Sequence, residues 1–302
     1  MRLRVEIQKY LSEQKARVET ALKHYIPAPV VPFTRHIESM RYSLFAGGKR
    51  IRPILCLAAA ETIRAKKEIG DSLLPVACAL ECIHTYSLIH DDLPAMDNDE
   101  LRRGKPTNHV LYGEAEAILA GDGLLTLAFE LITTDHGQGL SAVQRLDIAR
   151  VIARAAGSLG MVGGQFLDIA NENSQYPFEM LQTIHRRKTG ALITASVQAG
   201  AIAAGACADD SRALRVYSDE IGLAFQIVDD LLNATSTTEE LGKAAGSDES
   251  MGKATYPGYF GIDETRKKAQ EATARAKEAL CTFGENALPL RSLADYLYNR
   301  TY

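Results

Sequence analysis

Two pairs of adjacent aspartates, each directly after an apolar run, are the residues in this sequence best suited to chemistry. Asp91 and Asp92 lie in SLIHDDLPAMDND, and Asp229 and Asp230 lie in FQIVDDLLN. No lysine or arginine stands within four residues of Asp91 or Asp229. An acidic helix end that faces water would explain one such pair. Two pairs without basic neighbours at the ends of apolar helices are costly unless a cation balances them.

The first pair has a third carboxylate nearby. Pro94 bends the chain just after Asp92, so that Asp97 can turn back toward Asp91. Together the three offer only oxygen ligands, which is the ligand set that Mg²⁺ prefers. If both pairs face one cavity, they would hold several Mg²⁺ ions around a diphosphate.

Separate groups of basic residues indicate substrates that carry phosphate. A cation at a helix start opposes the helix dipole, and a bound anion removes this conflict. Guanidinium groups also match phosphate oxygens in a bidentate fashion. A solvated charged turn explains any one group as well, but all of them together with the acidic pairs imply two phosphorylated substrates. The groups are Lys49, Arg50 and Arg52 in AGGKRIRP, Arg102, Arg103 and Lys105 in RRGK, Arg186, Arg187 and Lys188 in HRRKTG, and Lys243 with Lys253.

His84 precedes Asp91 by seven residues, so that both lie on one helix face within about 20°. It is a candidate phosphate donor, or alternatively a histidine satisfied within the core. The chain has no GxxxxGK[ST] motif, no GxGxxG motif after a strand and no nucleophile-elbow motif. The usual nucleotide sites and covalent triads are therefore not expected.

Composition limits the other classes of function. The formal net charge is −4, so no overall basic field would hold nucleic acid. The five scattered cysteines fit the core of a reduced, cytoplasmic protein, and the charged N-terminus does not resemble a signal peptide. The uncharged stretch Thr189–Ala208 is long enough to cross a bilayer, but it is rich in alanine and glycine. It therefore predicts a closely packed buried helix and no membrane insertion.

Helical periodicity dominates the chain, and alternating strand patterns are almost absent. We expect one all-α domain over residues 1–302, with its main loop at 235–256. The predicted helices are Leu3–His24, Phe33–Phe45, one opened by Pro53, Pro75–His90, 111–133, 141–157, 178–206, 211–234, 263–282 and 287–300.

Seven segments in order along the chain resemble the trans-isoprenyl diphosphate synthases. The resemblance implies an isoprenoid synthase fold, in which about ten or more mostly antiparallel helices surround a deep central cavity, usually in a homodimer. The form of the first aspartate motif is similar to that of the bacterial farnesyl diphosphate synthases and related geranylgeranyl enzymes. The segments are GGKRIRP (47–53), HTYSLIHDDLPAMDNDELRRGKPTNH (84–109), LAGDGLL (119–125), GGQFLDI (163–169), HRRKTGAL (185–192), FQIVDDLLN (225–233) and LGK…GKATYP (241–257).

The resemblance also assigns roles to residues. Asp91, Asp92 and Asp97 would bind two Mg²⁺ ions, and Asp229 with Asp230 a third; Mn²⁺ is a possible substitute. Isopentenyl diphosphate would lie on Lys49, Arg52, His84 and Arg103, and the allylic diphosphate on Arg102, Lys188, Lys243 and Lys253. Thr189 and Gln226 would line the reacting carbons. The catalytic set would be Asp91, Asp92, Asp97, Lys188 and Asp229.

The implied reaction is a head-to-tail condensation. The allylic diphosphate ionises, the double bond of isopentenyl diphosphate attacks the cation, and the released diphosphate accepts a proton. Water must be excluded because it would quench the cation. The segment 235–256 and the C-terminal residues 291–302 are expected to act as lids.

Two positions bear on the product and on the metal. In similar enzymes a bulky aromatic residue five positions before the first aspartate favours the fifteen-carbon product, and Tyr86, followed by Ser87, stands there. A tyrosine packed against a neighbouring helix is the alternative interpretation of Tyr86. Asn233 replaces the last aspartate of the usual DDxxD motif, which predicts weaker binding of the third Mg²⁺ without loss of activity.

The main hypothesis is a farnesyl diphosphate synthase that accepts dimethylallyl and geranyl diphosphates. A geranylgeranyl diphosphate synthase is the nearest alternative, and its mark would be use of farnesyl diphosphate as a primer. A non-catalytic subunit of a heterodimeric synthase would have lost its aspartates or cationic positions. A terpene cyclase would not need the cationic group Lys49, Arg52 and His84.

Overall fold

The chain folds into long helices that run side by side. A computed structural model describes residues 2–64, 70–137, 139–172, 174–235 and 254–299, and the side chains of these residues except 2–6 and 70. Within these residues the only strands are β1 (Leu101–Arg102) and β2 (Lys105–Pro106), which form a short antiparallel hairpin. The expectation of an all-α protein with ten or more helices is therefore confirmed.

The first half of the chain follows the predicted helices closely. Both bounds lie within two residues of the predicted ones in α1 (Arg2–Tyr25), α2 (Thr34–Leu44), α4 (Leu74–Asp91) and α7 (Ala142–Ala156). α3 (Ile51–Arg64) begins two residues before the predicted start at Pro53. The segment 111–133 is divided by Gly113, whose φ of 93° ends α5 (Asn108–Tyr112) before α6 (Glu114–Thr133) begins. A short 3₁₀-helix, η1 (Gly70–Leu73), precedes α4.

The second half departs further from the prediction. The segment 178–206 consists of α9 (Phe178–His185), a single π-helical turn η2 (Arg186–Gly190) and α10 (Ala191–Ala204). α8 (Met161–Ala170) was not predicted, because glycines interrupt its pattern. The remaining elements are α11 (Ala208–Thr235), α14 (Tyr256–Glu278), which bends at Gly261, η3 (Cys281–Ala287) and α15 (Leu288–Tyr298).

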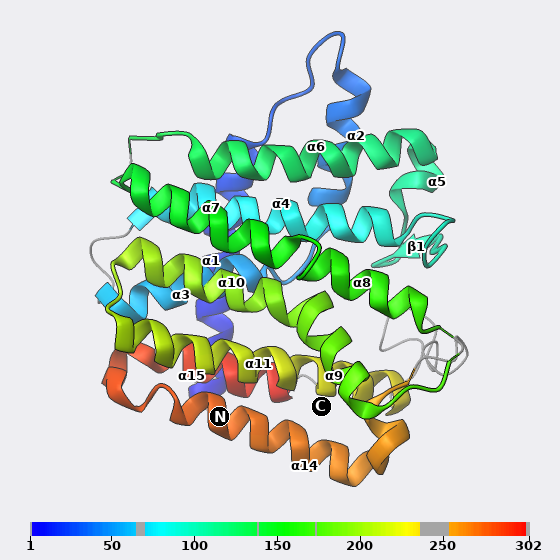
Figure 1. Ribbon diagram of the computed structural model, residues 1–302. Helices are drawn as coiled ribbons and strands as arrows, with labels where there is room; N and C mark the ends of the chain where they lie inside the picture. Colours follow the sequence, from blue (N-terminus) through cyan, green and yellow to red (C-terminus); the bar gives the residue numbers. More distant parts are fainter. Residues whose placement is uncertain (1, 65–69, 138, 173, 236–253, 300–302) are drawn as a thin grey trace.

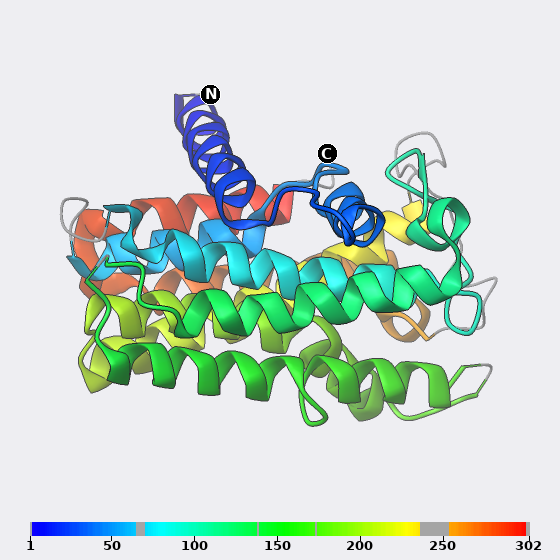
Figure 2. The same ribbon diagram turned by 90° about the horizontal axis from the view of Figure 1, so that it is seen from above.

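Figure 1 shows α6, α4, α7, α10, α11 and α14 as roughly parallel rods, stacked in that order down the view. Seen from above, α1 stands out steeply from these rods (Figure 2). The C-terminal ends of α4 and α11 lie on the same side of the bundle, and the β1–β2 hairpin is beside the end of α4 (Figure 1). The two acidic motifs, which are far apart in the sequence, therefore come to one end of the molecule.

α4 is the central helix of the largest apolar core, and most of its residues are buried. Residues Asp71–Asp91 have the length and composition of a membrane span, but 78% of the apolar window is buried inside the protein. The surrounding helices thus supply the apolar environment of this segment. The uncharged stretch at Thr189–Ala208 also forms a largely buried helix, α10, as expected.

α10 packs closely against α3 because Gly200 has no side chain. A Cβ atom at Gly200 would lie 2.1 Å from the carbonyl oxygen of Cys56. That distance is far below van der Waals contact, and a backbone carbonyl cannot rotate away as a side chain can. The two helices depend on this glycine for their separation.

Gly200→Ala should therefore push α3 and α10 apart. We expect a loss of about 2 kcal/mol or more in the free energy of unfolding, measured by denaturant titration. Gly258→Ala is the control, since its Cβ would meet only Thr255 Oγ1 at an ordinary 3.4 Å. Equal stability of the two variants would contradict the close packing.

Candidate active site

The first acidic motif closes on itself at the end of α4. The backbone N–H of Asp97 donates to the carbonyl of Asp91 over 2.9 Å, which confirms the predicted turn after Pro94. Burial, together with the neighbouring charges of Asp97 and Asp92, raises the pKa of Asp91 to about 6, while the positive charges of Lys188 and Arg102 oppose this shift. Like charges are thus gathered here at a cost that a cation would relieve.

Asp92 has a cationic partner in this structure. The guanidinium of Arg102 donates to both Asp92 carboxylate oxygens, with Nε at 2.8 and 2.9 Å. Asp92 is only 3% exposed, whereas Arg102 remains partly exposed and also lies 3.6 Å from Asp99. The roles predicted for Asp92 and Arg102 therefore require them to separate, one toward a metal and the other toward a diphosphate.

The second acidic motif lies at the end of α11. One Asp230 oxygen accepts a hydrogen bond from the backbone N–H of Tyr256 over 2.8 Å, and the other lies 3.8 Å from Nε2 of His185. Asp229 is near enough to Arg52 to raise the pKa of its guanidinium. Asn233, one turn later, is 7% exposed and shares the buried environment of Asp230.

Lys188 on η2 lies between Asp168 of α8 and the first acidic motif. Its Nζ donates to Asp168 of α8 over 2.7 Å. Burial alone would lower the pKa of Lys188, but the charges of Asp168 and Asp91 outweigh it and raise the pKa. Lys188 is therefore held protonated, beside the first acidic motif and one π-helical turn after His185.

The adjacent residues Arg102 and Arg103 of the hairpin bind different partners. Arg102 ends β1, whereas Arg103 lies in the turn with Gly104, and both turn residues have positive φ, 55° and 72°. Arg103 donates through Nη1 to the carbonyl of Gly47, and its guanidinium fills the space that a side chain at Gly48 would need. Arg103 is thus brought to the loop before α3, while Arg102 stays with Asp92.

His84 lies among arginines. Burial and the positive charges of Arg52 and Arg103, followed by those of Arg102 and Arg50, hold its pKa well below the ordinary value. A neutral imidazole can still donate one N–H to a phosphate oxygen. Burial lowers the pKa of Arg52 to about 10, which leaves its guanidinium charged at neutral pH. The structure therefore brings His84, Arg52 and Arg103 together.

Lys49 and Arg50 point to different surroundings. The Lys49 ammonium lies 5.9 Å from the centre of the Tyr296 ring, near the C-terminal helix α15. Arg50 is buried, with Nη1 bonded to Glu81 at 2.7 Å and Nη2 to the carbonyl of Leu44 at 2.9 Å. Arg50 is therefore a structural cation of the loop, whereas Lys49 and Arg52 flank it.

Tyr86 is 6% exposed and its ring packs edge-on against His90, with the ring centres 5.6 Å apart. Burial raises its pKa to about 12, with Asp91 adding to the effect. Ser87 donates back to the carbonyl of His84 over 2.9 Å. Thr189 and Gln226 are both half-buried. Lys243 and Lys253 lie outside the described residues.

Sequence reasoning missed Asp168 and His185. GGQFLDI was recognised as a motif without a role, and the structure supplies one. A Cβ at Gly164 would lie 2.1 Å from the backbone nitrogen of Lys188, so the glycine lets α8 lie against η2. Asp168 is four residues further along the same face and reaches the Lys188 side chain.

The residues present fit a hard divalent cation in their chemistry. The available ligand atoms are the carboxylate oxygens of Asp91, Asp92 and Asp97. The negative charges of Asp92 and Asp97 repel that of Asp91 and raise its pKa. Within the described ranges, no three His, Cys, Asp or Glu side chains already surround one metal position. Since Asp92 is bonded to Arg102, the set must rearrange on binding.

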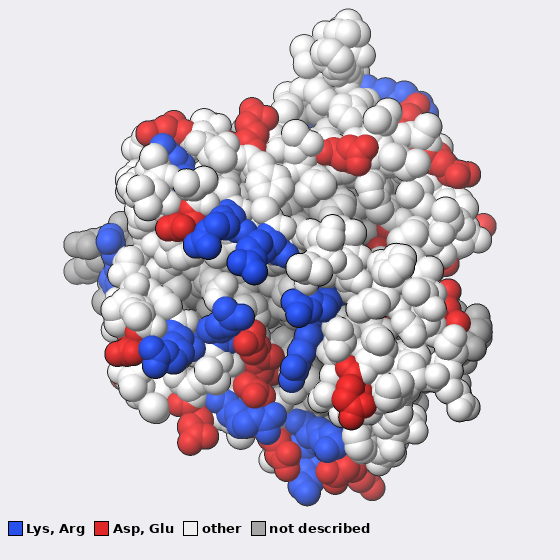
Figure 3. Space-filling model, viewed as in Figure 1, with Lys and Arg blue, Asp and Glu red and all other residues white. Residues whose placement is uncertain are grey.

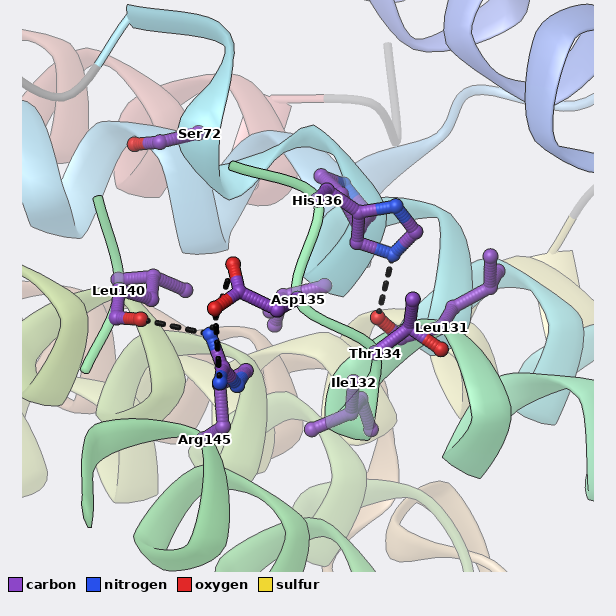
Figure 4. A pocket seen from close by; sticks show the side chains of 10 residues that line it. Ser72, Leu131, Ile132, Thr134, Asp135, His136, Leu140 and Arg145 are labelled. Atoms are coloured by element: carbon purple, nitrogen blue, oxygen red, sulfur yellow. Dashed lines mark hydrogen bonds and ion pairs between the residues drawn. The ribbon is translucent and has the colours of Figure 1, made fainter. Parts of the chain in front are cut away.

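The described part of the protein has two further hollows. A groove of about 1290 Å³ runs along α10 between α7 and α11, and His185, Arg186 and Arg187 are among the residues that line it. Figure 3 shows Lys and Arg side chains around a hollow on this face. A second space, about 10 Å³, lies at the end of α6, where Arg145 binds Asp135 and Leu140 (Figure 4). It holds no more than one water molecule.

Comparison with known proteins identifies relatives over nearly the whole chain. Residues 34–282 match the polyprenyl synthetase family. A geranylgeranyl diphosphate synthase of Cyanophora paradoxa is 50% identical, covering 96% of this chain and 95% of its own. A farnesyl diphosphate synthase of Geobacillus stearothermophilus is 49% identical, covering 87% and 88%.

The fold has the same relatives. The apo structure of an FPP/GFPP synthase from Zymomonas mobilis superposes with a TM-score of 0.86 at 38% identity, and covers 97% of this chain and 99% of its own. The family, the helical isoprenoid synthase fold and the aspartate and basic motifs agree with one another. The chain belongs to the polyprenyl synthetase family of prenyltransferases.

Proposed function

We propose that this prenyltransferase is a farnesyl diphosphate synthase, which condenses isopentenyl diphosphate with dimethylallyl and then geranyl diphosphate. The supporting observation is that the two acidic motifs and the cations around His84, which are Arg52 and Arg103, lie at one end of the bundle. The positive charge of Lys188 is close enough to Asp91 to lower its pKa, and the negative charge of Asp229 is close enough to Arg52 to raise the pKa of its guanidinium. A site that combines these residues would suit two diphosphates and their metal ions.

We infer a division of labour from these surroundings. Lys49, Arg52, His84 and Arg103 would hold isopentenyl diphosphate, because three of them already gather where the α3 loop, α4 and the hairpin meet. Arg102 and Lys188, beside the first acidic motif, would hold the allylic diphosphate with Lys243 and Lys253. Thr189 and Gln226 would face the reacting carbons.

The aspartates on both walls would hold Mg²⁺, about three ions, which would neutralise charge on the leaving diphosphate; Mn²⁺ is a possible substitute. Lys188 and Arg102 would add fixed positive charge to the same oxygens as the allylic C–O bond breaks and the diphosphate leaves with the bonding electrons. The double bond of isopentenyl diphosphate attacks the cation, and the proton lost next passes to the released diphosphate.

The product length is the finer part of the proposal, because relatives at 50% and 49% identity make different products by name. Tyr86 supports the fifteen-carbon product. Its ring is buried one helical turn and a half before Asp91, and its packing against His90 holds it in place. A fixed aromatic ring at this depth would stop the growing chain.

We also propose that the protein is a cytoplasmic homodimer. Apolar side chains are exposed on α5, α6 and α8, an arrangement that suits a partner surface. They are Val110, Leu111, Ile118, Leu119, Val162 and Phe166. Neither nucleic acid nor membrane insertion is part of the proposal.

Product analysis tests the proposal directly. Purified protein with Mg²⁺ and isopentenyl diphosphate would be given dimethylallyl, geranyl or farnesyl diphosphate as separate primers. We expect farnesyl diphosphate as the end product and no use of the farnesyl primer. A twenty-carbon product would keep the reaction and refute the farnesyl assignment. No condensation with any primer would favour a non-catalytic subunit.

Tyr86→Ala should lengthen the product. Removing the ring opens space along α4, and each additional isoprene unit needs about one helical turn, ~5 Å. Chromatography of the chain lengths should show products of twenty carbons or more. Tyr86→Phe keeps the ring and should keep the fifteen-carbon product. An unchanged product from Tyr86→Ala would contradict the role of Tyr86.

Asn233→Asp should reduce the Mg²⁺ concentration needed for half-maximal activity, because it restores a carboxylate one turn after Asp229 on α11. The measurement is a Mg²⁺ titration of the initial rate, and we expect a shift of about threefold or more, corresponding to roughly 0.7 kcal/mol. Identical titration curves for the variant and the native chain would refute this view of Asn233.

A further inference from the structure

Glu81 is a buried carboxylate close to Arg52 and Arg103, the cations around His84, and the proposed function gives it no role. It is 2% exposed and lies on α4, three residues before His84. Its Oε1 accepts a hydrogen bond from Arg50 Nη1 over 2.7 Å. Its Oε2 is buried and has no hydrogen-bond partner within the described part of the chain. A carboxylate is seldom buried in this way without a reason.

Arg50 joins four parts of the chain through one guanidinium. Besides Glu81 on α4, it bonds to the carbonyl of Leu44 at the end of α2 and lies 3.7 Å from Glu19 on α1. Its own backbone has a φ of 54°, which is unfavourable for a residue with a side chain. The ion pair with Glu81 thus helps to hold the Gly47–Arg52 loop in a conformation that it would not readily adopt alone.

The charge of Glu81 also reaches the other cations. It raises the pKa of both Arg52 and Arg103, against the effect of burial. Arg52 Nε is buried and lacks a hydrogen-bond partner among the described residues. Cations brought together in this way repel one another, and Glu81 is the buried acid that balances them.

We propose that Glu81 is a positioning residue for the isopentenyl diphosphate site: it fixes the loop through Arg50 and keeps the cations together until the diphosphate brings its own negative charge. This inference rests on the proposed function. Glu81 lies behind the cations and does not touch the substrate. Its charge stabilises the protein and at the same time competes with the diphosphate for the same arginines.

This double role predicts effects of opposite sign. Glu81→Gln keeps an oxygen acceptor for Arg50 but removes the charge, so we expect a lower melting temperature and a KM for isopentenyl diphosphate that falls about threefold or more. Arg50→Gln leaves Glu81 unbalanced, so we expect a lower melting temperature and a KM that rises about tenfold. In both variants the KM for the allylic substrate should stay within about twofold.

The double variant Arg50→Gln, Glu81→Gln removes both charges and should bring the KM for isopentenyl diphosphate back to within about threefold of the native value. The control is Glu116→Gln, which breaks an exposed ion pair with Arg35 of the same 2.7 Å length. It should alter neither the melting temperature nor either KM.

The outcomes separate the two proposals. A KM for isopentenyl diphosphate that rises in Glu81→Gln, or a parallel change in both KM values, would make Glu81 a core ion pair and overturn the inference. Binding of isopentenyl diphosphate to the native protein is measured first by calorimetry. If the native protein does not bind it, the proposed function fails, and with it the inference.

Discussion

The structure depends on balancing ionised side chains that are gathered at one end of an apolar bundle. α4 ends at Asp91, and α11 carries Asp229 and Asp230 near its C-terminal end, at Thr235. The balance is made by specific partners: Arg102 for Asp92, Lys188 for Asp168 and Arg50 for Glu81. Buried charges that lost these partners would cost several kcal/mol each. The arrangement of α8, η2 and the hairpin follows from the need to bring these partners in.

The regular helices supply rigidity, and the irregular backbone aims the charges. Arg50 and Arg103, two of the three non-glycine residues with positive φ among the described residues, carry cations into this end of the bundle. The π-helical turn η2 places His185 near Asp230 while Lys188 faces Asp168. A straight α-helix would fix the angle between these two side chains at about 300° of rotation, and the wider turn changes it. Strained or unusual backbone of this kind is typical of functional sites.

Much of this fold could be predicted from the sequence, because helical periodicity and breakers act locally. The helix starts predicted at Pro53 and Pro75 lie within two residues of those in the structure. The misses have a different cause. α8 depends on Gly164, which is needed because the backbone of Lys188 packs directly against it. This contact cannot be predicted from the local sequence. The hairpin depends on two residues with positive φ, and one of them is an arginine, which carries no turn signal.

Residue types were predicted better than partners. The acidic and basic motifs predicted a charged site, because aspartate pairs at the ends of apolar helices are costly without a cation. Their pairing could not be read from spacing, because Asp92 and Arg102 meet only after the chain has turned back at the segment that follows Pro94. For the same reason Arg50 resembled Lys49 and Arg52 in sequence, although its side chain is buried against Glu81.

The pairs at this end of the bundle differ in what substrate binding would do to them. Arg102 is one-third exposed and bonded to an aspartate of the first acidic motif. If a metal ion bound Asp92 and a diphosphate bound Arg102, as proposed above, each charge would exchange one partner for another, so that neither would be left uncompensated. Arg50 and Glu81 are both almost fully buried and neither is expected to meet a ligand, so this pair persists through the cycle. An exchangeable pair next to a permanent one would let the proposed substrates bind while the loop that carries Lys49 and Arg52 keeps its conformation.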